Sequence, residues 1–241
     1  MRGWRAVRTI IAFEMRREWT GVLVTFLFAC YFGIIFSGSA IDPLDRSAAA
    51  RFYEGVRDWA YLFGFPLFGC MMNRTIFAYW RDDPFTRRIA HWRTMPIPLS
   101  AIVGARYAQA VLMTAIVGSG FIALQYAIHG GFRERVELSD WIAAGLVWIA
   151  YGFVIQSAYI LLELGFAGKT FVKWYLGYSA ILALLCALLA WQDVNVFDEV
   201  LAASTARPLL WSAVALAAVA AALWTGSRLT LRRMQRRRYT F

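Results

Sequence analysis

The chain has 241 residues, of which 60% are hydrophobic and 17% aromatic, and its mean hydropathy is +0.52. This composition excludes an ordinary soluble domain, so we expect an all-α membrane protein. The formal net charge of +10 is also typical of nucleic-acid-binding proteins, but the positions of the charges, described below, argue against that class.

Residues 1–20 have the pattern of an amphipathic helix. Trp4, Val7, Ile11 and Met15 fall on one face of it, and arginines fall on another. A helix with two such faces lies in the plane of the membrane interface, where its basic side contacts anionic lipid headgroups. We therefore expect an N-terminal interfacial helix that is separate from the membrane-spanning part.

Six further segments are each apolar over about 20 residues, the length that an α-helix needs to cross a bilayer. They predict a six-span transmembrane domain over residues 21–227, and residues 228–241 then form a basic tail. The predicted spans are 21–40, 59–80, 101–128, 141–162, 174–191 and 208–227. A secretory signal peptide, with a cleavage site at Gly38-Ser39-Ala40, is the alternative interpretation of the first span.

Lysine and arginine are distributed unequally between the two sides that six spans define. The side with both termini and the loops after spans two and four, flanking Arg74 and Arg106 included, holds 19 of the 25. By the positive-inside rule this side is cytoplasmic, which predicts a multi-pass protein of the bacterial cytoplasmic membrane with both termini inside. Ten of the 15 acidic residues lie outside, so the positive surplus reflects orientation and lipid contact, and we expect no nucleic-acid partner.

The second predicted span contains Pro66, which removes a backbone hydrogen bond and bends a helix. Arg74 comes before the end of the same apolar run, where an ionised side chain has to pair or reach the interface. We expect Glu163, at the cytoplasmic end of the fourth span, to be its partner. The alternative is that the span ends near Met72 and the helix continues into water.

Residues 81–106, RDDPFTRRIAHWRTMPIPLSAIVGAR, connect the second and third spans and contain a predicted short helix. Asp83 is a helix-capping residue and Pro84 suits the first helical position, because proline lacks only an amide hydrogen that would have no partner there. Pro96 and Pro98 end the helix, since a residue before proline is disfavoured in helical geometry.

An apolar stripe of Phe85, Ile89 and Trp92 runs along this helix. We expect the stripe to be too short and too narrow for burial in this chain's own core, so that it enters a groove on a partner protein. Contact with lipid headgroups is the alternative. The basic residues expected at the rim of that groove are Arg87, Arg88 and Arg93.

The loop resembles the cytoplasmic loop of ABC-2 type exporter permeases in the spacing of Pro96, Ser100, Gly104 and Arg106. The resemblance implies that the short helix is a coupling helix for cytoplasmic ABC ATPase subunits, and that the N-terminal helix is a connector that also contacts them. It further implies pairing with a second permease copy or a homologous permease. ATP and Mg²⁺ then belong to the ATPase, and this chain needs no cofactor.

The loop after the fourth span resembles, by position, the second ATPase-docking loop of that family, with Gly165 and Gly168 permitting a tight turn. The tripeptide Gly168-Lys169-Thr170 also imitates the end of a phosphate-binding loop. Glu163 stands where that motif requires its first glycine, and a carboxylate there would repel the phosphates. We therefore expect no ATP binding by this chain.

The centres of the predicted spans carry no charged residue, which favours a passive pathway whose energy comes from an ATPase partner. Gln125, Gln156 and Ser157 are the polar residues expected to line such a path, with hydrogen bonding between helices as the alternative. The prediction is an exporter permease for a lipidic, amphipathic or peptide-like substrate. Alternatives are a membrane-embedded enzyme, for which no catalytic or metal-ligating set is present in the sequence, and a non-transporting membrane scaffold.

Overall fold

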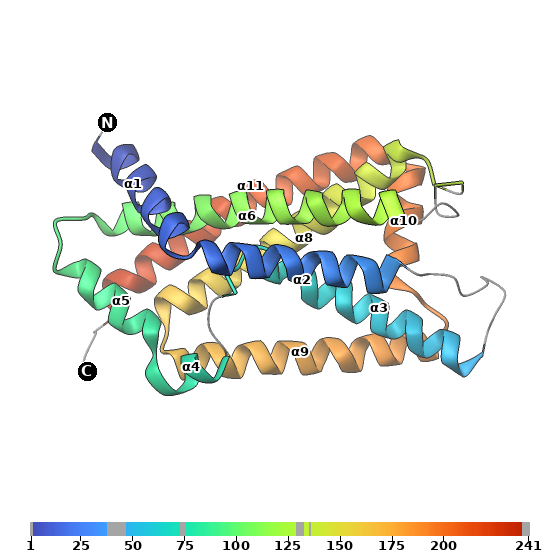
Figure 1. Ribbon diagram of the computed structural model, residues 1–241, viewed down its shortest axis with the longest axis horizontal. Helices are drawn as coiled ribbons and strands as arrows, with labels where there is room; N and C mark the ends of the chain where they lie inside the picture. The colour runs from blue at the N-terminus through green and yellow to red at the C-terminus, as the bar shows by residue number, and fades with distance from the viewer. Residues whose placement is uncertain (1, 38–46, 73–75, 129–132, 135, 238–241) are drawn as a thin grey trace.

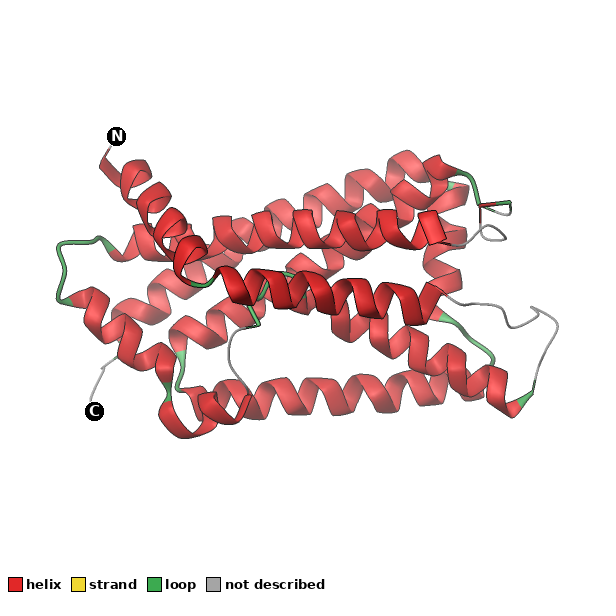
Figure 2. Cartoon of the chain, in the orientation of Figure 1, coloured by secondary structure: helices red, strands yellow, loops and turns green. Residues whose placement is uncertain are grey.

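The computed structural model describes residues 2–37, 47–72, 76–128, 133–134 and 136–237, and helices are the only regular secondary structure in these ranges (Figure 2). The helices are α1 (Arg2–Arg17), α2 (Trp19–Ser37), α3 (Ala48–Leu67), α4 (Ile76–Asp82), α5 (Pro84–Arg93), α6 (Leu99–Ile128), α8 (Leu138–Gly165), α9 (Gly168–Trp191), α10 (Val196–Ala206) and α11 (Pro208–Arg236). The prediction of an all-α chain is confirmed.

Long helices lie side by side along the longest axis of the molecule (Figure 1). The short helices α4 and α5 gather at one end of this bundle, together with α1 and the end of α11, whereas α10 lies at the opposite end. We call the first the basic end, because α1, α5 and α11 bring most of their arginines to it.

Five helices in the described part of the chain are long and apolar enough to cross a membrane: α2, α6, α8, α9 and α11. Half of the most apolar stretch of α8 is buried, against 6% of that of α9, so α8 is the central helix and α9 lies at the periphery. An exposed apolar surface of this extent is expected where lipid covers it. The chain is therefore a multi-pass membrane protein by length and composition of its helices.

The second predicted span, residues 59–80, is not one helix. The helix α3 ends at Leu67, directly after Pro66, and α4 begins only at Ile76. The proline was expected to bend the helix, and it stands instead in the last turn of a helix that ends there. Residues 73–75 lie outside the described residues, and the predicted pairing of Arg74 with Glu163 lies outside them too.

Hydroxyl groups from neighbouring helices satisfy the backbone around this break. Because Pro66 has no amide hydrogen, the carbonyl of Leu62 loses its helical partner, and the hydroxyls of Tyr151 and Tyr178 donate to it at 3.0 and 3.2 Å. Beyond the proline, the fully buried Thr25 hydroxyl donates to the Cys70 carbonyl at 2.9 Å. In an apolar bundle, only protein groups of this kind make non-helical backbone tolerable.

The break packs tightly against the centre of the bundle. A Cβ atom on Gly69 would lie 2.7 Å from side-chain atoms of both Gln156 and Thr114, so no larger residue fits without displacement of these groups. Between the break and α10, aromatic rings of α3, α6, α8 and α10, together with Phe68 directly after α3, form the core of the bundle. Its fully or almost fully buried members are Tyr61, Phe65, Phe68, Phe121, Trp141, Trp148 and Phe197.

The helix α10 closes the end of the bundle opposite the basic end, and a buried carboxylate holds its first turn. Asp58 accepts hydrogen bonds from the backbone amides of Val196 at 2.6 Å and Phe197 at 3.0 Å. The neighbouring Arg57 lies over the Phe197 ring and donates to Asp198 at 3.1 Å. Burial raises the pKa of Asp58 to about 6, although both amide hydrogen bonds and the nearby Arg57 oppose this rise.

The raised pKa of Asp58 predicts a pH-dependent stability. Between about pH 4 and pH 6 the folded protein holds a proton that the unfolded chain releases, so the free energy of unfolding should fall as pH rises, by roughly 3 kcal/mol, and level off above pH 6. Thermal unfolding in detergent across this range measures the effect. Asp58→Asn should flatten the profile, and an unchanged slope in that variant would assign the titration to another group.

Candidate functional site

Five charged side chains from four helices meet inside the basic end. These residues, which we call the ionic cluster, are Glu14, Glu18, Arg88, Arg106 and Glu163. Arg88 of α5 lies 3.4 Å from Glu14, 3.2 Å from Glu18 and 3.4 Å from Glu163. Arg106 of α6 lies 2.8 Å from Glu163 of α8. The cluster therefore connects α1, α5, α6 and α8 to one another.

Helix geometry explains how the carboxylates come together. Glu14 and Glu18 are four residues apart across the junction of α1 and α2, where the backbone hydrogen bond between them continues the helical pattern, so both face α5. Glu14 and Glu163 are almost completely buried. Burial raises the pKa of Glu14, whereas Arg88 and Arg106 lower it. The guanidinium groups are thus required if these carboxylates are to be buried in charged form.

The predicted start of the α5 helix is confirmed. The Asp83 side chain accepts a hydrogen bond from the Thr86 amide at 3.2 Å and another from the Thr86 hydroxyl at 2.7 Å, and Pro84 is the first helical residue. The helix is therefore fixed at its first turn, and this sets the direction in which Arg88 points.

The prediction that the apolar stripe of α5 is free for a partner is wrong. Ile89 is 1% exposed and belongs to a buried cluster with residues of α6, α8 and α11. Phe85 is also buried: its ring stacks on Tyr79 at 4.7 Å and meets Phe171 edge-on at 5.8 Å. Because the chain breaks between α3 and α4, α4 and the start of α9 lie beside α5 and supply the apolar wall that one continuous helix over residues 59–80 would not have provided.

The other residues predicted at the docking surface have mixed positions. Trp92 is half-buried, with the Arg88 guanidinium 5.2 Å from the centre of its ring. Arg87 and Arg93 are exposed, and Arg93 donates to the Arg237 carbonyl at 3.4 Å. Only these two of the predicted arginines thus present their side chains at the surface, since Arg88 belongs to the ionic cluster.

Gly165 and Gly168 are both buried, and neither adopts a left-handed conformation. A Cβ atom on Gly168 would lie 2.2 Å from the Tyr79 carbonyl oxygen, and one on Gly165 would lie 2.8 Å from the Arg233 side chain. These glycines therefore allow α4 and α11 to approach the connection between α8 and α9 closely. The connection between α8 and α9 is short, as predicted. Its glycines are needed because neighbouring helices approach closely, and not because the turn requires a special backbone conformation.

The three residues predicted to line a path all point into the protein. Gln125 accepts a hydrogen bond from the Tyr61 hydroxyl at 2.5 Å, and the Gln156 carbonyl oxygen lies 3.4 Å from the Cys70 sulfur as an acceptor. The Ser157 hydroxyl donates to the Ala222 carbonyl at 3.2 Å. These contacts are the hydrogen bonds between helices that formed the alternative interpretation, and the role in a path stays a prediction.

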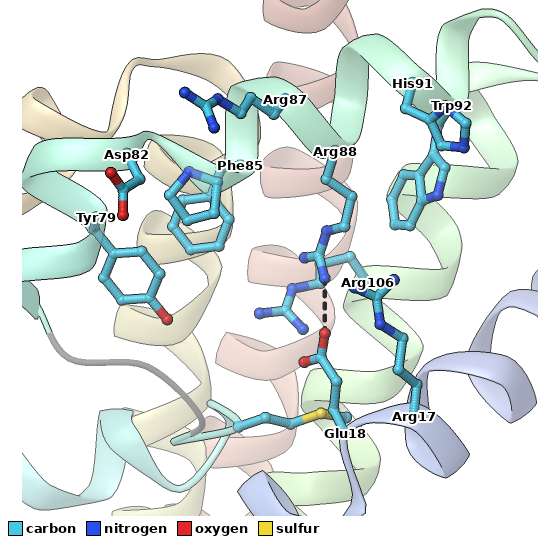
Figure 3. A pocket seen from close by; sticks show the side chains of 12 residues that line it. Arg17, Glu18, Tyr79, Asp82, Phe85, Arg87, Arg88, His91, Trp92 and Arg106 are labelled. Atoms are coloured by element: carbon cyan, nitrogen blue, oxygen red, sulfur yellow. Dashed lines mark hydrogen bonds and ion pairs between the residues drawn. The ribbon is translucent and has the colours of Figure 1, made fainter.

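A cavity of about 450 Å³ opens beside the ionic cluster, between α1, α4, α5 and α6 (Figure 3). Its basic lining residues are Arg17, Arg87, Arg88, His91 and Arg106, and its aromatic ones are Tyr79, Phe85 and Trp92. Figure 3 shows Arg88 and Arg106 reaching from α5 and α6 into the same space as Glu18. The sequence analysis did not predict this arrangement. The few carboxylates among the arginine-rich segments could have indicated ion pairs there.

No family model matches the chain, and neither a curated protein nor a solved structure shows significant similarity to it. Within the described ranges, no group of histidine, cysteine, aspartate and glutamate residues is arranged to hold a metal ion. The fold and the site therefore define a multi-pass helical membrane protein with a buried ionic cluster at its basic end.

Removing one carboxylate should show how strongly the ionic cluster depends on charge balance. Glu163→Gln leaves Arg106, whose side chain is only 13% exposed, without its closest counter-charge, which should lower the free energy of unfolding by about 3–5 kcal/mol. Replacing both partners, as Glu163→Leu with Arg106→Met, should cost clearly less, because no buried charge is left unpaired. Thermal unfolding in detergent compares the two variants, and an equal loss in both would contradict the ionic explanation.

Proposed function

We propose that this chain is the membrane-spanning permease subunit of an ATP-driven exporter of the ABC-2 type, which moves a lipidic, amphipathic or peptide-like substrate out of the cytoplasm. The observation that carries the proposal is the position of α5. This capped helix lies at the basic end of the bundle, and the ionic cluster connects it to three other helices.

An ATPase partner can act on the membrane-spanning helices only through an element that moves with them. Arg88 joins α5 to carboxylates of α1 and α8, and Ile89 packs into the apolar cluster between α6 and α8. A displacement of α5 therefore has to displace these helices or break buried ion pairs, which is costly. These contacts give α5 the properties of a coupling helix.

Because Phe85 and Ile89 are buried, they cannot form the docking surface, and we propose exposed residues of the same region in their place. Lys169, the second residue of α9, lies next to the cap of α5, because its neighbour Gly168 is in close contact with Tyr79 and Asp83. Arg93 lies at the other end of α5, about 15 Å along the helix axis. We propose that acidic groups of the ATPase lie opposite these two cations, because complementary charges favour association of the two proteins at this surface.

The proposal includes six crossings, with α3 and α4 as the two parts of a broken second span. Helix α3 runs from the far end of the bundle towards its centre, and α4 stands at the basic end (Figure 1). Together with the five complete spans, this crossing puts α1 and the end of α11 on one side, the cytoplasmic side in the proposed orientation. Broken helices packed inside the bundle are common in transport proteins.

The charges of the five candidate spans also support a permease that takes its energy from a partner. In these helices the acidic and basic residues lie towards the ends, as Arg106, Glu163 and Lys169 do, and the middle of each helix is uncharged. A coupled ion would need an acidic or basic carrier near the centre of the membrane. Pairing with a second permease copy or a homologous permease would complete the transport unit.

The proposed orientation predicts opposite labelling of the two ends of the bundle. In a chain without its native cysteines, Glu199→Cys on α10 should react with an impermeant maleimide in intact cells, because this residue is exposed at the outer end. Arg81→Cys on α4, where the side chain is 87% exposed, should react only after permeabilisation. Labelling of Arg81→Cys in intact cells would contradict the orientation.

The docking surface predicts loss of the ATPase on charge reversal. Arg93→Glu with Lys169→Glu should reduce recovery of a co-expressed ABC ATPase by about tenfold or more, because like charges at an interface cost several kcal/mol. The matched control, Arg133→Glu with Arg207→Glu, reverses two exposed charges elsewhere in the chain and should leave recovery unchanged. Equal recovery from both variants would contradict this surface, and no recovery with the unchanged chain would favour an enzyme or a scaffold.

A further inference from the structure

The cavity at the basic end is lined by two arginines that lie outside the ionic cluster, Arg17 and Arg87. Four arginines line it, whereas its acidic lining residues are Glu18 and Asp82. Arg88 and Arg106 are bound within the ionic cluster. The side chains of Arg17 and Arg87 make no hydrogen bond or ion pair with any part of the chain that the structure describes. Two guanidinium groups, one on α1 and one on α5, are therefore available to an anion.

With α6 centred in a bilayer, the cavity would lie at the boundary between the hydrocarbon and the headgroups. Helix α6 has 30 residues, hence a length of about 45 Å, and exceeds a hydrocarbon core of about 30 Å by roughly 7 Å at each end. Arg106, which lines the cavity, lies seven residues after Leu99, about 10 Å along the axis. The cavity thus opens where headgroups meet the hydrocarbon.

The cavity also has an apolar wall. Tyr79, Phe85 and Trp92 place aromatic rings next to the guanidinium groups. Helix α1, which forms another wall, exposes Trp4 (70%) and Phe13 (58%) beside its arginines, as a helix at the membrane interface does. A phospholipid presents a phosphate and the first carbons of its acyl chains together, whereas inorganic phosphate would leave the aromatic wall unused.

We propose that this cavity binds an anionic phospholipid of the cytoplasmic leaflet. Arg17 of α1 and Arg87 of α5 lie on different sides of the cavity (Figure 3), and each donates to oxygens of the lipid headgroup, since guanidinium groups form charge-assisted hydrogen bonds with phosphate. The aromatic wall contacts the glycerol and upper acyl region. The proposal requires the basic end to lie at the cytoplasmic surface and does not depend on an ATPase, so its failure is separate from failure of the docking surface.

Native mass spectrometry of the full chain tests the site, after solubilisation from membranes that contain phosphatidylglycerol and phosphatidylcholine. The unchanged protein should retain phosphatidylglycerol in preference to phosphatidylcholine. Arg17→Gln with Arg87→Gln should retain about tenfold less, because it removes the charge-assisted hydrogen bonds to phosphate. The matched control, Arg16→Gln with Arg232→Gln, removes two exposed charges outside the cavity lining and should behave like the unchanged protein.

Three results would overturn the proposal. The first is equal retention of the two lipids, and the second is equal retention of phosphatidylglycerol by the cavity variant and the unchanged protein. The third is an equal loss in the control, which would assign the binding to surface charge in general. Excess inorganic phosphate serves as a further arm: if it displaces the lipid as completely as the Arg17 and Arg87 substitutions do, a soluble phosphate is the ligand. Lipid that stays bound in that arm supports the proposal.

Discussion

The arrangement of the basic end depends on the break of the helix after Pro66, where side-chain hydroxyls supply hydrogen bonds to the backbone. A proline near the end of a membrane-embedded helix removes one donor, and the chain beyond it leaves several backbone groups without helical partners. Tyr151, Tyr178 and Thr25 supply those partners. Since the chain can leave the helix here, α4 reaches α9 and brings Phe85 of α5 into contact with both. The position of Arg88, and with it the ionic cluster, follows from this route of the backbone.

The ionic cluster contains three carboxylates and two arginines. Buried ion pairs of this kind are weak evidence that the folded protein is stabilised. Burying charges costs several kcal/mol for each ion, and the attraction between them offsets this cost only with good geometry. The contact of Arg106 with Glu163 at 2.8 Å has such geometry, and Gln109 accepts a further hydrogen bond from Arg106 at 2.8 Å. The longer contacts of Arg88 are weaker. A firm bond between α6 and α8 beside looser bonds to α5 suits a helix that transmits movement.

The sequence analysis located the apolar helices well, because a segment of about 20 apolar residues in a membrane protein is most stable as a helix that crosses the bilayer. It also located the start of α5, since Asp83 and Pro84 determine a helix start through local contacts alone. The break of the second span was underestimated. Pro66 itself indicates only a bend, and the groups that make a complete break tolerable, Thr25 and Tyr178, are 41 and 112 residues away in the sequence.

The same limit explains the error about the stripe on α5. A short amphipathic helix has the same pattern whether its apolar side meets another protein or another part of its own chain. The outcome depended on α4 and α9, which cover Phe85, and on α6, α8 and α11, which cover Ile89, and no local pattern places these helices beside α5. The charges gave a better indication. Glu14, Glu18 and Glu163 stand among arginines in segments that the sequence predicts on one side of the membrane, and a carboxylate near the hydrocarbon needs a partner there.

The two faces of α5 separate the proposed contacts. Arg87 and His91 are four residues apart and line the cavity beside α1, whereas Arg93, together with Lys169 of α9 at the other end of α5, belongs to the proposed docking surface. Arg88 lies between them, with its guanidinium turned inward to the ionic cluster. A ligand in the cavity and a protein on the docking surface would therefore both act on one short helix, whose inner side is bound to α1 and α8. Arg88 through its ion pairs and Ile89 through its apolar contacts are therefore the residues of α5 through which the two contacts would be coupled to the spans.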